Sequence, residues 1–325
     1  MNIAYFTNNY RPFIGGVPIA IDKLAAGLRS LGHKVLIFAP DYGEDSGQVD
    51  EPDVFRAVAV HNFNHTRFAL PLLLGPEGYD RFTRFRPDVV HVHHPFLLGS
   101  TGLHLAREQN LPVIFTYHTQ YEKYAHYLPW DTQMVQAMAV KVGARFANQC
   151  DAVIAPSSDI LQMLRERGVK VPIEVIPTGV DPVPFRNADA GWLRCHLAIP
   201  PEDRILLFVS RLAREKNIGF LIEAFARLAV ADPHVRFVLV GSGDDKENLK
   251  SAVAGTGHAS RVHFTGTLTG PALYNAFAGG DLFLFSSLTE TQGMVVLEAM
   301  AAGLPVVALD APGVRDIVQN DVNGY

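Results

Sequence analysis

Two glutamates in the stretch ETQGMVVLE carry the first candidate chemistry. Glu290 lies in a polar turn, whereas Glu298 lies between Leu297 and Ala299 in an apolar run that has the pattern of a buried helix. A helix rises 1.5 Å per residue, so eight helical positions would separate the carboxylates by about 12 Å. Carboxylates accept hydrogen bonds from hydroxyls. This spacing predicts that Glu290 contacts a sugar and Glu298 contacts the ribose of one extended ligand.

The residues between these glutamates begin the predicted helix. The first amides of a helix point outward and favour anions, because the helix dipole is positive at that end. We therefore expect this start to meet the phosphates that would join the sugar to the ribose. The predicted contacts come from Gln292, Gly293, Met294 and Val295.

Two cations occur in SRLAREK, directly after the strand pattern ILLFV. Arg211 and Lys216 would lie in a loop at the carboxyl end of that strand, where two positive charges suit a diphosphate. The alternative is ordinary solvated loop charge, which is the commoner fate of an isolated Arg and Lys.

Glycines at two strand ends could admit a phosphate or a sugar close to the backbone. Gly15 and Gly16 precede the first predicted helix, and Gly241 lies in VGSG. Glycine leaves room for such an approach, although an ordinary turn explains the first pair equally well. The stretch GSGDDK has Lys246 where the dinucleotide fingerprint GxGxxG needs glycine, which counts against a dehydrogenase.

Histidines follow two further strand patterns. His118 comes just after VIFT, where an imidazole can orient a hydroxyl or stabilise developing charge. A tyrosine-rich segment continues from it and supplies the predicted acceptor-side residues Tyr121, Tyr124, His126 and Tyr127. The stretch VVHVHHPF has histidines at metal-like spacing, but the chain contains no DxD motif and no cysteine lies near these histidines. We interpret His91, His93 and His94 as structural and predict no metal site.

Short β-branched runs alternate along the chain with amphipathic stretches, which predicts parallel strands joined by crossover helices. The fold class is therefore α/β, with two facing Rossmann-like, doubly wound domains and a cleft between them. We expect an N-terminal acceptor-side domain at 1–180, a linker region at 181–203 and a C-terminal nucleotide-binding domain at 204–325. Ligands of such sheets bind at the carboxyl ends of the strands.

Composition restricts the class of protein. The 325 residues carry a formal net charge of −5, with 48% hydrophobic and 19% charged residues, which disfavours nucleic acid as a partner. The two cysteines, Cys150 and Cys195, have no metal or redox spacing. The amino terminus lacks a signal-peptide pattern, and the apolar runs are too short to cross a bilayer. We expect a cytoplasmic protein.

Taken together, GGV, His118, SRLAREK, VGSG and ETQGMVVLE followed by AMAAGLPVVA resemble the retaining glycosyltransferases of family four, which adopt the GT-B fold. The resemblance spans nearly the whole chain. It implies that Gly16 and His118 face the donor sugar, and that Arg211 and Lys216 hold its diphosphate. It also implies that Glu290 contacts the sugar hydroxyls and that Glu298 binds the ribose.

The same resemblance implies a hexosyltransferase that retains the anomeric configuration. It uses a nucleotide sugar as co-substrate and needs neither a cofactor nor a metal ion. A front-face mechanism is expected, in which the leaving phosphate helps to deprotonate the acceptor. Family members usually continue past NGY with further helices, so the C-terminal domain is expected to be truncated.

The stretches HTQYEKYAHYLPW and TETQG look like those of the subgroup that glucosylates diacylglycerol, with UDP-glucose as donor. One alternative is a GDP-mannose-dependent mannosyltransferase that acts on an inositol lipid or a saccharide. Another is a sugar-nucleotide-binding protein without catalysis. A lipid acceptor would suit peripheral contact with the cytoplasmic membrane face, for which HTRFALPLLLGPEGYDRFTRFRPD offers apolar residues and Arg67, Arg81, Arg84 and Arg86. Core packing with solvated arginines explains that segment equally well.

Overall fold

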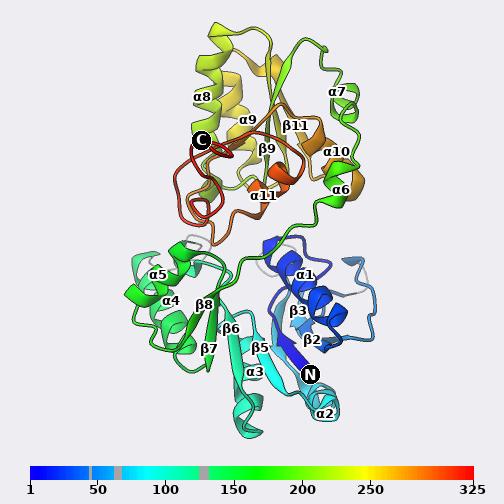
Figure 1. Cartoon of the computed structure of the whole chain (residues 1–325), viewed down its shortest axis with the longest axis vertical. Helices are drawn as coiled ribbons and strands as arrows, with labels where there is room; N and C mark the ends of the chain where they lie inside the picture. Colours follow the sequence, from blue (N-terminus) through cyan, green and yellow to red (C-terminus); the bar gives the residue numbers. More distant parts are fainter. Residues whose placement is uncertain (44–45, 62–67, 124–131) are drawn as a thin grey trace. The chain divides into compact units, whose positions relative to one another are not determined.

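A computed structural model describes residues 1–43, 46–61, 68–123 and 132–325 of the chain. It divides into two compact units, an N-terminal unit of Met1–Thr178 and a C-terminal unit of Gly179–Tyr325. Each unit is a β-sheet with helices packed on it (Figure 1). The predicted α/β class with two doubly wound domains is confirmed.

The N-terminal unit contains a sheet in the order β4-β3-β2-β1-β5-β6-β7-β8. Its strand pairs are parallel except for β3 with β4. The runs of Val, Ile and Phe predicted as strands form its centre, where both faces are covered and polar residues would be desolvated. The strands are β1 (Asn2–Phe6), β2 (Lys34–Pro40), β3 (Val54–Val60), β4 (Leu70–Leu73), β5 (Val89–Val92), β6 (Val113–Thr116), β7 (Ala152–Ala155) and β8 (Ile173–Val175).

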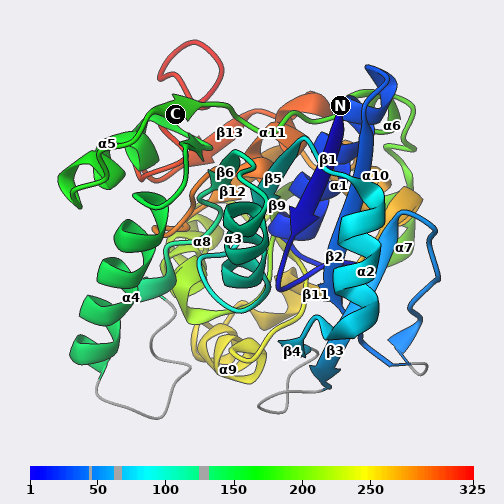
Figure 2. The ribbon, with the colours of Figure 1, turned by 90° about the horizontal axis from the view of Figure 1, so that it is seen from below.

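Helices cover both faces of this sheet. The ribbon shows these helices on the two sides of the sheet (Figure 2). Ile21 of the first helix packs with Tyr5 on one face, whereas Phe82 and Leu103 from the next two helices pack with Phe6 on the other face. Alternate residues of β1 thus enter different cores, as expected for a strand buried on both faces. The helices are α1 (Gly16–Ser30), α2 (Gly75–Phe85), α3 (Leu98–Glu108), α4 (Thr132–Ala147) and α5 (Ser158–Glu166).

The C-terminal unit contains a parallel sheet in the order β11-β10-β9-β12-β13. Strands and helices alternate along the chain, as the sequence predicts. The strands are β9 (Arg204–Val209), β10 (Val235–Val240), β11 (Val262–Gly266), β12 (Leu282–Phe285) and β13 (Val306–Ala308). The helices are α6 (Val183–Arg186), α7 (Trp192–Leu197), α8 (Ile218–Ala231), α9 (Lys246–Gly255), α10 (Gly270–Ala278) and α11 (Met294–Ala301), with 3-10 turns η4 (Arg214–Lys216) and η5 (Ala259–Arg261).

Residues 181–203 are not a linker, which corrects the predicted domain boundaries. The division falls between Thr178 and Gly179, and the following residues belong to the C-terminal unit. Phe185 of α6 and Leu193 of α7 are buried in its core. These two side chains remove enough apolar surface from water to fix the segment on the unit.

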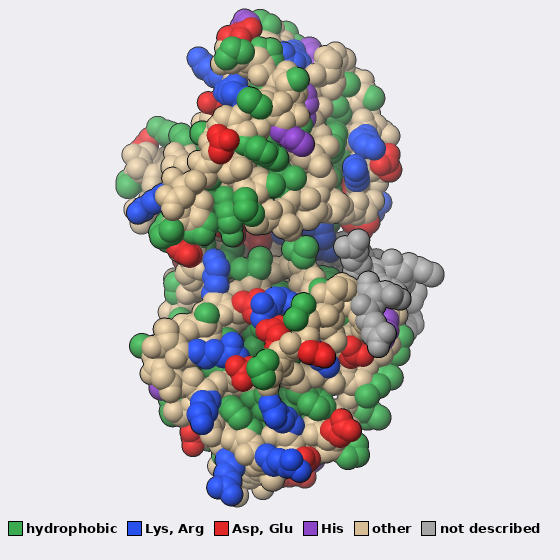
Figure 3. All heavy atoms as spheres, turned by 90° about the vertical axis from the view of Figure 1, so that its right-hand side faces the viewer, with side chains coloured by type: hydrophobic (Ala, Val, Ile, Leu, Met, Phe, Trp, Pro, Cys, Tyr) green, Lys and Arg blue, Asp and Glu red, His purple; other side chains and the backbone are tan. Residues whose placement is uncertain are grey.

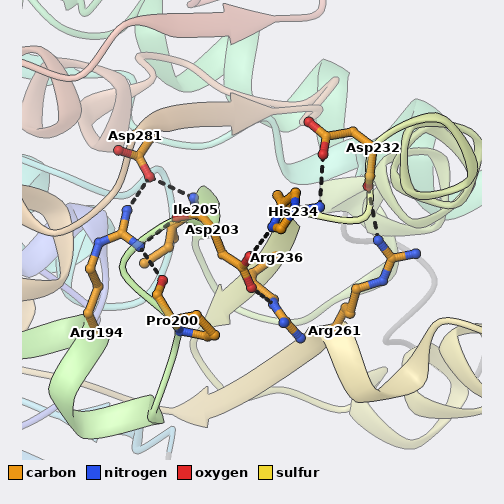
Figure 4. A network of polar contacts seen from close by, with 9 residues as sticks. All are labelled: Arg194, Pro200, Asp203, Ile205, Asp232, His234, Arg236, Arg261 and Asp281. Atoms are coloured by element: carbon orange, nitrogen blue, oxygen red, sulfur yellow. Dashed lines mark hydrogen bonds and ion pairs between the residues drawn. The ribbon is translucent and has the colours of Figure 1, made fainter.

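A network of polar contacts joins the amino-terminal ends of three strands in the C-terminal unit (Figure 4). The buried carboxylate of Asp203, just before β9, accepts hydrogen bonds from Arg236 and from the ring of His234, which flank the start of β10. Arg194 donates to Asp281, which precedes β12. Burial opposes the charge on Asp203, but the hydrogen bonds from His234 and Arg236 outweigh it and lower the pKa of this carboxyl. Together the contacts of the network fix the starts of the strands. The opposite strand ends are thereby left for binding.

Candidate active site

The carboxyl ends of β1, β5 and β6 carry the polar groups of the N-terminal unit. These strands are adjacent and parallel, so the loops after them meet at one edge of the sheet. Asn8 follows β1, His94 follows β5 and His118 follows β6. The amide of Asn8 donates to Nδ1 of His94 at 3.1 Å and joins the first two loops. The predicted position of His118 just after a strand is confirmed.

A row of histidine rings leads from the sheet to His118. Nε2 of His91 is 2.7 Å from Oγ1 of Thr116, and the rings of His91 and His93 stack with centroids 4.3 Å apart. Nδ1 of His93 lies 2.9 Å from Nε2 of His118. His91 and His93 are therefore structural, as interpreted from the sequence, but His93 has a further task that the sequence did not reveal. It orients the ring of His118.

Burial makes these imidazoles weak bases. It lowers the pKa of His118 to about 4, and it lowers the pKa of His91 and His94 to about 3. Burial also places the pKa of His93 well below the usual value. All four rings are neutral at pH 7, because a charged ring would lose its hydration inside the unit. His118 can then exchange hydrogen bonds with a hydroxyl, but it does not act there as a cationic acid.

Stability of the N-terminal unit should fall in mild acid for the same reason. In the unfolded chain, histidine binds a proton below about pH 6.5, whereas the folded rings do so only near pH 3 to 4. Unfolding therefore takes up protons, and each ring should remove about 1.4 kcal/mol of stability per pH unit below pH 6.5, down to its folded pKa. Urea unfolding at pH 7.5, 6.0 and 5.0 measures this loss.

His104→Gln provides the control for this pH dependence. His104 is an exposed residue of α3, so this variant removes a histidine without removing a buried ring. His118→Asn removes one buried ring, so it should reduce the dependence of the unfolding free energy on pH by the contribution of one proton. An unfolding free energy that is constant between pH 7.5 and 5.0 would contradict the burial of these rings.

The predicted glycines Gly15 and Gly16 lie where α1 begins. Gly15 is the residue before the helix, and its extended backbone, with φ −179°, suits any amino acid. A Cβ on Gly16 would lie more than 4 Å from the described atoms outside its chain neighbours and the nearby backbone of its own helix. Packing of the unit therefore does not demand glycine at 16, which leaves open the close approach of a ligand that the sequence suggested.

Two glycines of α3 were missed by the sequence analysis. A Cβ on Gly99 would lie 1.7 Å from the carbonyl oxygen of His94, and one on Gly102 would lie 2.6 Å from the ring of Phe6. Their spacing of three places both on one face of the helix. They let α3 approach β1 and the loop after β5 that contains His93 and His94, called here the histidine loop. This close packing holds His94 in place. The sequence signal was available in LLGSTG, a pair of glycines at helical spacing.

The predicted acceptor-side residues fall partly within the described chain. The ring of Tyr121 packs edge-on against Phe96, with centroids 5.1 Å apart. The neighbouring Glu122 is held by Arg167, whose Nη2 donates to its carboxylate at 2.6 Å. Tyr124, His126 and Tyr127 lie outside the described residues, so their predicted role stays a prediction.

The C-terminal unit brings together Lys216 and Glu290, which are 74 positions apart in the sequence. Nζ of Lys216 donates to Oε1 of Glu290 at 2.5 Å. The two side chains are only 11% and 16% exposed, so the pair is far less screened than a surface ion pair. Lys216 follows β9 and Glu290 follows β12, the adjacent strand. The solvated-loop alternative is therefore wrong for Lys216.

Arg211 lies at the same edge and forms an ion pair with Glu215. The carboxylate of Glu215 is almost completely buried, whereas the side chain of Arg211 is about half exposed, at 47%. The partner at Glu215 was not anticipated, although Arg and Glu four apart could have suggested it. The pair fixes one end of the guanidinium and keeps a cation at the strand end.

The glycines of VGSG have a structural reason. Gly241 has φ +143°, and a Cβ there would lie 1.8 Å from the carbonyl oxygen of Ser210. The backbone after β10 thus passes directly beside the loop that carries Arg211, which any side chain would prevent. Gly241 therefore has a structural role, and its contact with the sugar-nucleotide donor stays a prediction.

The geometry assumed for the two glutamates needs a correction. Helix α11 begins at Met294, so only Glu298 of the pair is helical, and the separation of about 12 Å expected from helical rise does not apply. Glu298 is half-buried on α11, as its apolar neighbours suggested. The polar stretch before Gly293 forms a loop, and the backbone of Gly313 lies so close to it that a Cβ there would be 2.8 Å from the carbonyl oxygen of Glu290.

The amides predicted to contact phosphate at the start of α11 have partners within the chain. The amide of Gly293 donates to the carbonyl of Gly313 at 2.9 Å, and the amide of Met294 donates to the carbonyl of Gln292 at 2.8 Å. Both donors are occupied within the chain, so they do not point to a phosphate in this conformation. The side chain of Gln292 is buried and that of Val295 packs on the core. Their proposed contact with the donor stays a prediction.

The segment predicted for membrane contact carries mixed charge. Arg84 pairs with Asp80 at 2.9 Å and Arg81 donates to the carbonyl of Pro52, whereas Arg67 lies outside the described residues. Figure 3 shows acidic and basic side chains interspersed on this face of the N-terminal unit. Leu72 and Leu73 of β4 are nevertheless exposed, at 54% and 69%. The described part of the segment therefore has an apolar edge beside mixed charge.

Over the residues that the structure describes, no group of three His, Cys, Asp or Glu side chains is arranged to hold a metal ion. Within the same residues, none of the helices has the length and apolar character required to span a bilayer.

Comparison with known families accounts for nearly the whole chain. Residues 14–183 match the model of Glycosyltransferase Family 4, and residues 193–325 match that of Glycosyl transferases group 1. Among solved structures, Anabaena HepE in complex with UDP-glucose superposes with a TM-score of 0.79 at 21% identity, covering all of this chain and 85% of that one. This likeness confirms the predicted GT-B fold class.

Curated relatives of defined activity match over most of their length. Alpha-monoglucosyldiacylglycerol synthase of Streptococcus pneumoniae is 31% identical, covering all of this chain and 74% of the relative. GDP-mannose-dependent alpha-mannosyltransferase of Mycobacterium tuberculosis is 32% identical, covering 98% of this chain and 81% of the relative. Together with the family match over more than half of its residues, these relatives show that the chain belongs to the glycosyltransferases of family 4.

Proposed function

We propose that this glycosyltransferase transfers glucose from UDP-glucose to a lipid acceptor such as diacylglycerol, with retention of configuration and without a metal ion. The observation that carries the proposal is the contact between Lys216 and Glu290. It places a cation suited to a diphosphate beside a carboxylate suited to sugar hydroxyls, as a nucleotide sugar requires. The name of the S. pneumoniae relative, which matches this chain over its full length, supports the choice of acceptor.

The proposed chemistry takes place on one face of the sugar. The acceptor hydroxyl oxygen bonds to C1 as the bond from C1 to the diphosphate oxygen breaks, and the hydroxyl proton passes to that leaving oxygen. Arg211 and Lys216 stabilise the negative charge that develops on the diphosphate. Glu290 orients the sugar through its hydroxyls, and neutral His118 exchanges a hydrogen bond with the sugar. Glu298 binds the ribose, and Gly16 gives the donor access to the start of α1.

A membrane-bound acceptor also requires the enzyme to reach a lipid surface. We include peripheral contact with the cytoplasmic membrane face in the proposal, supported by the exposed Leu72 and Leu73 of β4. Apolar side chains at an edge can insert among headgroups without a spanning helix.

The similarity to the M. tuberculosis enzyme favours a second candidate, a GDP-mannose-dependent mannosyltransferase acting on an inositol lipid or a saccharide. Titration calorimetry with UDP-glucose, UDP-galactose and GDP-mannose separates the two. The proposal expects UDP-glucose to bind at least ten times more tightly than GDP-mannose. The reverse order would replace it with the mannosyltransferase, and binding of a nucleotide sugar without any transfer would indicate a non-catalytic binding protein.

A further inference from the structure

Leu97, between β5 and α3, has a strained backbone. Its φ is +54° and its ψ is −120°, a conformation that favours glycine and is rare for a branched side chain. Leu97 directly follows the histidine loop, at the edge of the sheet where His94 and His118 lie. Strain of this kind persists only where neighbouring contacts impose it, and it concentrates at functional positions.

The contacts that impose it come from Asn8. This side chain is fully buried. Its Nδ2 donates to the carbonyl of Phe96 at 2.9 Å, and its Oδ1 accepts from the amide of Leu98 at 3.1 Å. One amide thus holds the peptides on both sides of Leu97. Because the backbone N–H of Asn8 also donates to Nδ1 of His94, the strained turn and the histidine are fixed by the same residue.

The turn presents apolar surface beside polar groups. Phe96 is 36% exposed and Leu97 is 37% exposed. The ring of Phe96 packs against Tyr121 at 5.1 Å and against His94 at 6.2 Å. A relaxed turn with a small polar residue would cost less conformational energy and expose less apolar area to water. Folding therefore does not explain why leucine occupies this position.

We propose that Phe96 and Leu97 form the surface that holds the acyl-glycerol part of the acceptor, and that Asn8 is the residue that positions them. The inference rests on the proposed function and deepens it. The acceptor's hydroxyl is attached directly to an apolar body, so its site needs hydrogen-bonding groups next to apolar ones. His94 and His118 supply the hydrogen-bonding groups at the edge of the sheet, and the strained turn at Leu97 supplies the apolar side chains.

Leu97→Gly tests the inference because function and stability respond in opposite directions. Glycine adopts a positive φ without strain, so the melting temperature should stay the same or rise. The KM for dioctanoylglycerol should rise about tenfold, because a buried leucine contact is lost from the complex. Leu31→Gly removes a leucine that is 74% exposed at the end of α1, and it should leave this KM unchanged.

Asn8→Ala tests the positioning role in a double-mutant cycle. Alone, it should raise the same KM several-fold, whereas in the Leu97→Gly background it should add little, because the side chain to be positioned is already absent. Equal effects in both backgrounds would overturn the positioning role. A KM for Leu97→Gly equal to that of the wild type would overturn the contact surface. If the wild type transfers no glucose to dioctanoylglycerol, the proposed function itself fails, and the inference falls with it.

Discussion

Lys216→Ala should lower the rate of sugar transfer by about 10²- to 10³-fold. In the wild type, Nζ of Lys216 lies in a largely buried setting at the end of β9, where a cation stabilises developing phosphate charge far more strongly than it would in water. The substitution also leaves Glu290 without the partner that holds its carboxylate. Steady-state kinetics with UDP-glucose and dioctanoylglycerol measure the loss, and circular dichroism establishes that the variant is folded.

Arg214→Ala is the matched control for this loss. Arg214 belongs to the same 3-10 turn, two residues before Lys216, but it is exposed. A cation in water is screened and contributes little to charge at the strand end. Its removal should therefore reduce transfer by less than threefold. If the two variants lost activity equally, the role assigned to the Lys216–Glu290 contact would be wrong.

Gly99→Ala should destabilise the N-terminal unit by about 2 to 4 kcal/mol and abolish most transfer. The new Cβ would lie 1.7 Å from the carbonyl oxygen of His94. That oxygen belongs to the backbone, so it cannot turn away as a flexible side chain could. Either α3 moves off the sheet or the histidine loop shifts, and both displace His94 from Asn8. Urea unfolding and the transfer assay measure the two effects.

The same substitution elsewhere should have the opposite sign. Gly27 is an exposed residue inside α1, and a Cβ there would lie more than 4 Å from the described atoms outside its own helix and chain neighbours. Alanine has the higher helix propensity, so Gly27→Ala should stabilise the chain by about 0.5 to 1 kcal/mol. A Gly99→Ala variant as stable as the wild type would show that α3 does not pack as closely as described.

The sequence predicted the fold class and the strand ends well, because both depend on local patterns. Alternating strand and helix patterns indicate parallel sheets, and such sheets place their binding residues after the strands. His118, Arg211, Lys216 and Glu290 could be placed in this way. Their positions follow from counting residues after an apolar run.

Contacts between distant segments could not be predicted in that way. The pairing of Lys216 with Glu290, and of His93 with His118, depends on which strands become neighbours in the sheet. Glu290 lies in the loop before α11, where the amide of Gly293 bonds to the carbonyl of the distant Gly313. The segment at 181–203 has the composition of a linker, but its few apolar side chains enter the core. Tertiary contacts decided each case against the local pattern.

The central claim is tested most directly by incubating the protein with radiolabelled UDP-glucose and diacylglycerol vesicles, and counting the label extracted into the organic phase. Lys216→Ala serves as the inactive control. We predict that label enters the lipid with the wild type and falls by at least 10²-fold with the variant. A wild type that binds UDP-glucose but leaves the organic phase unlabelled would contradict transfer to diacylglycerol.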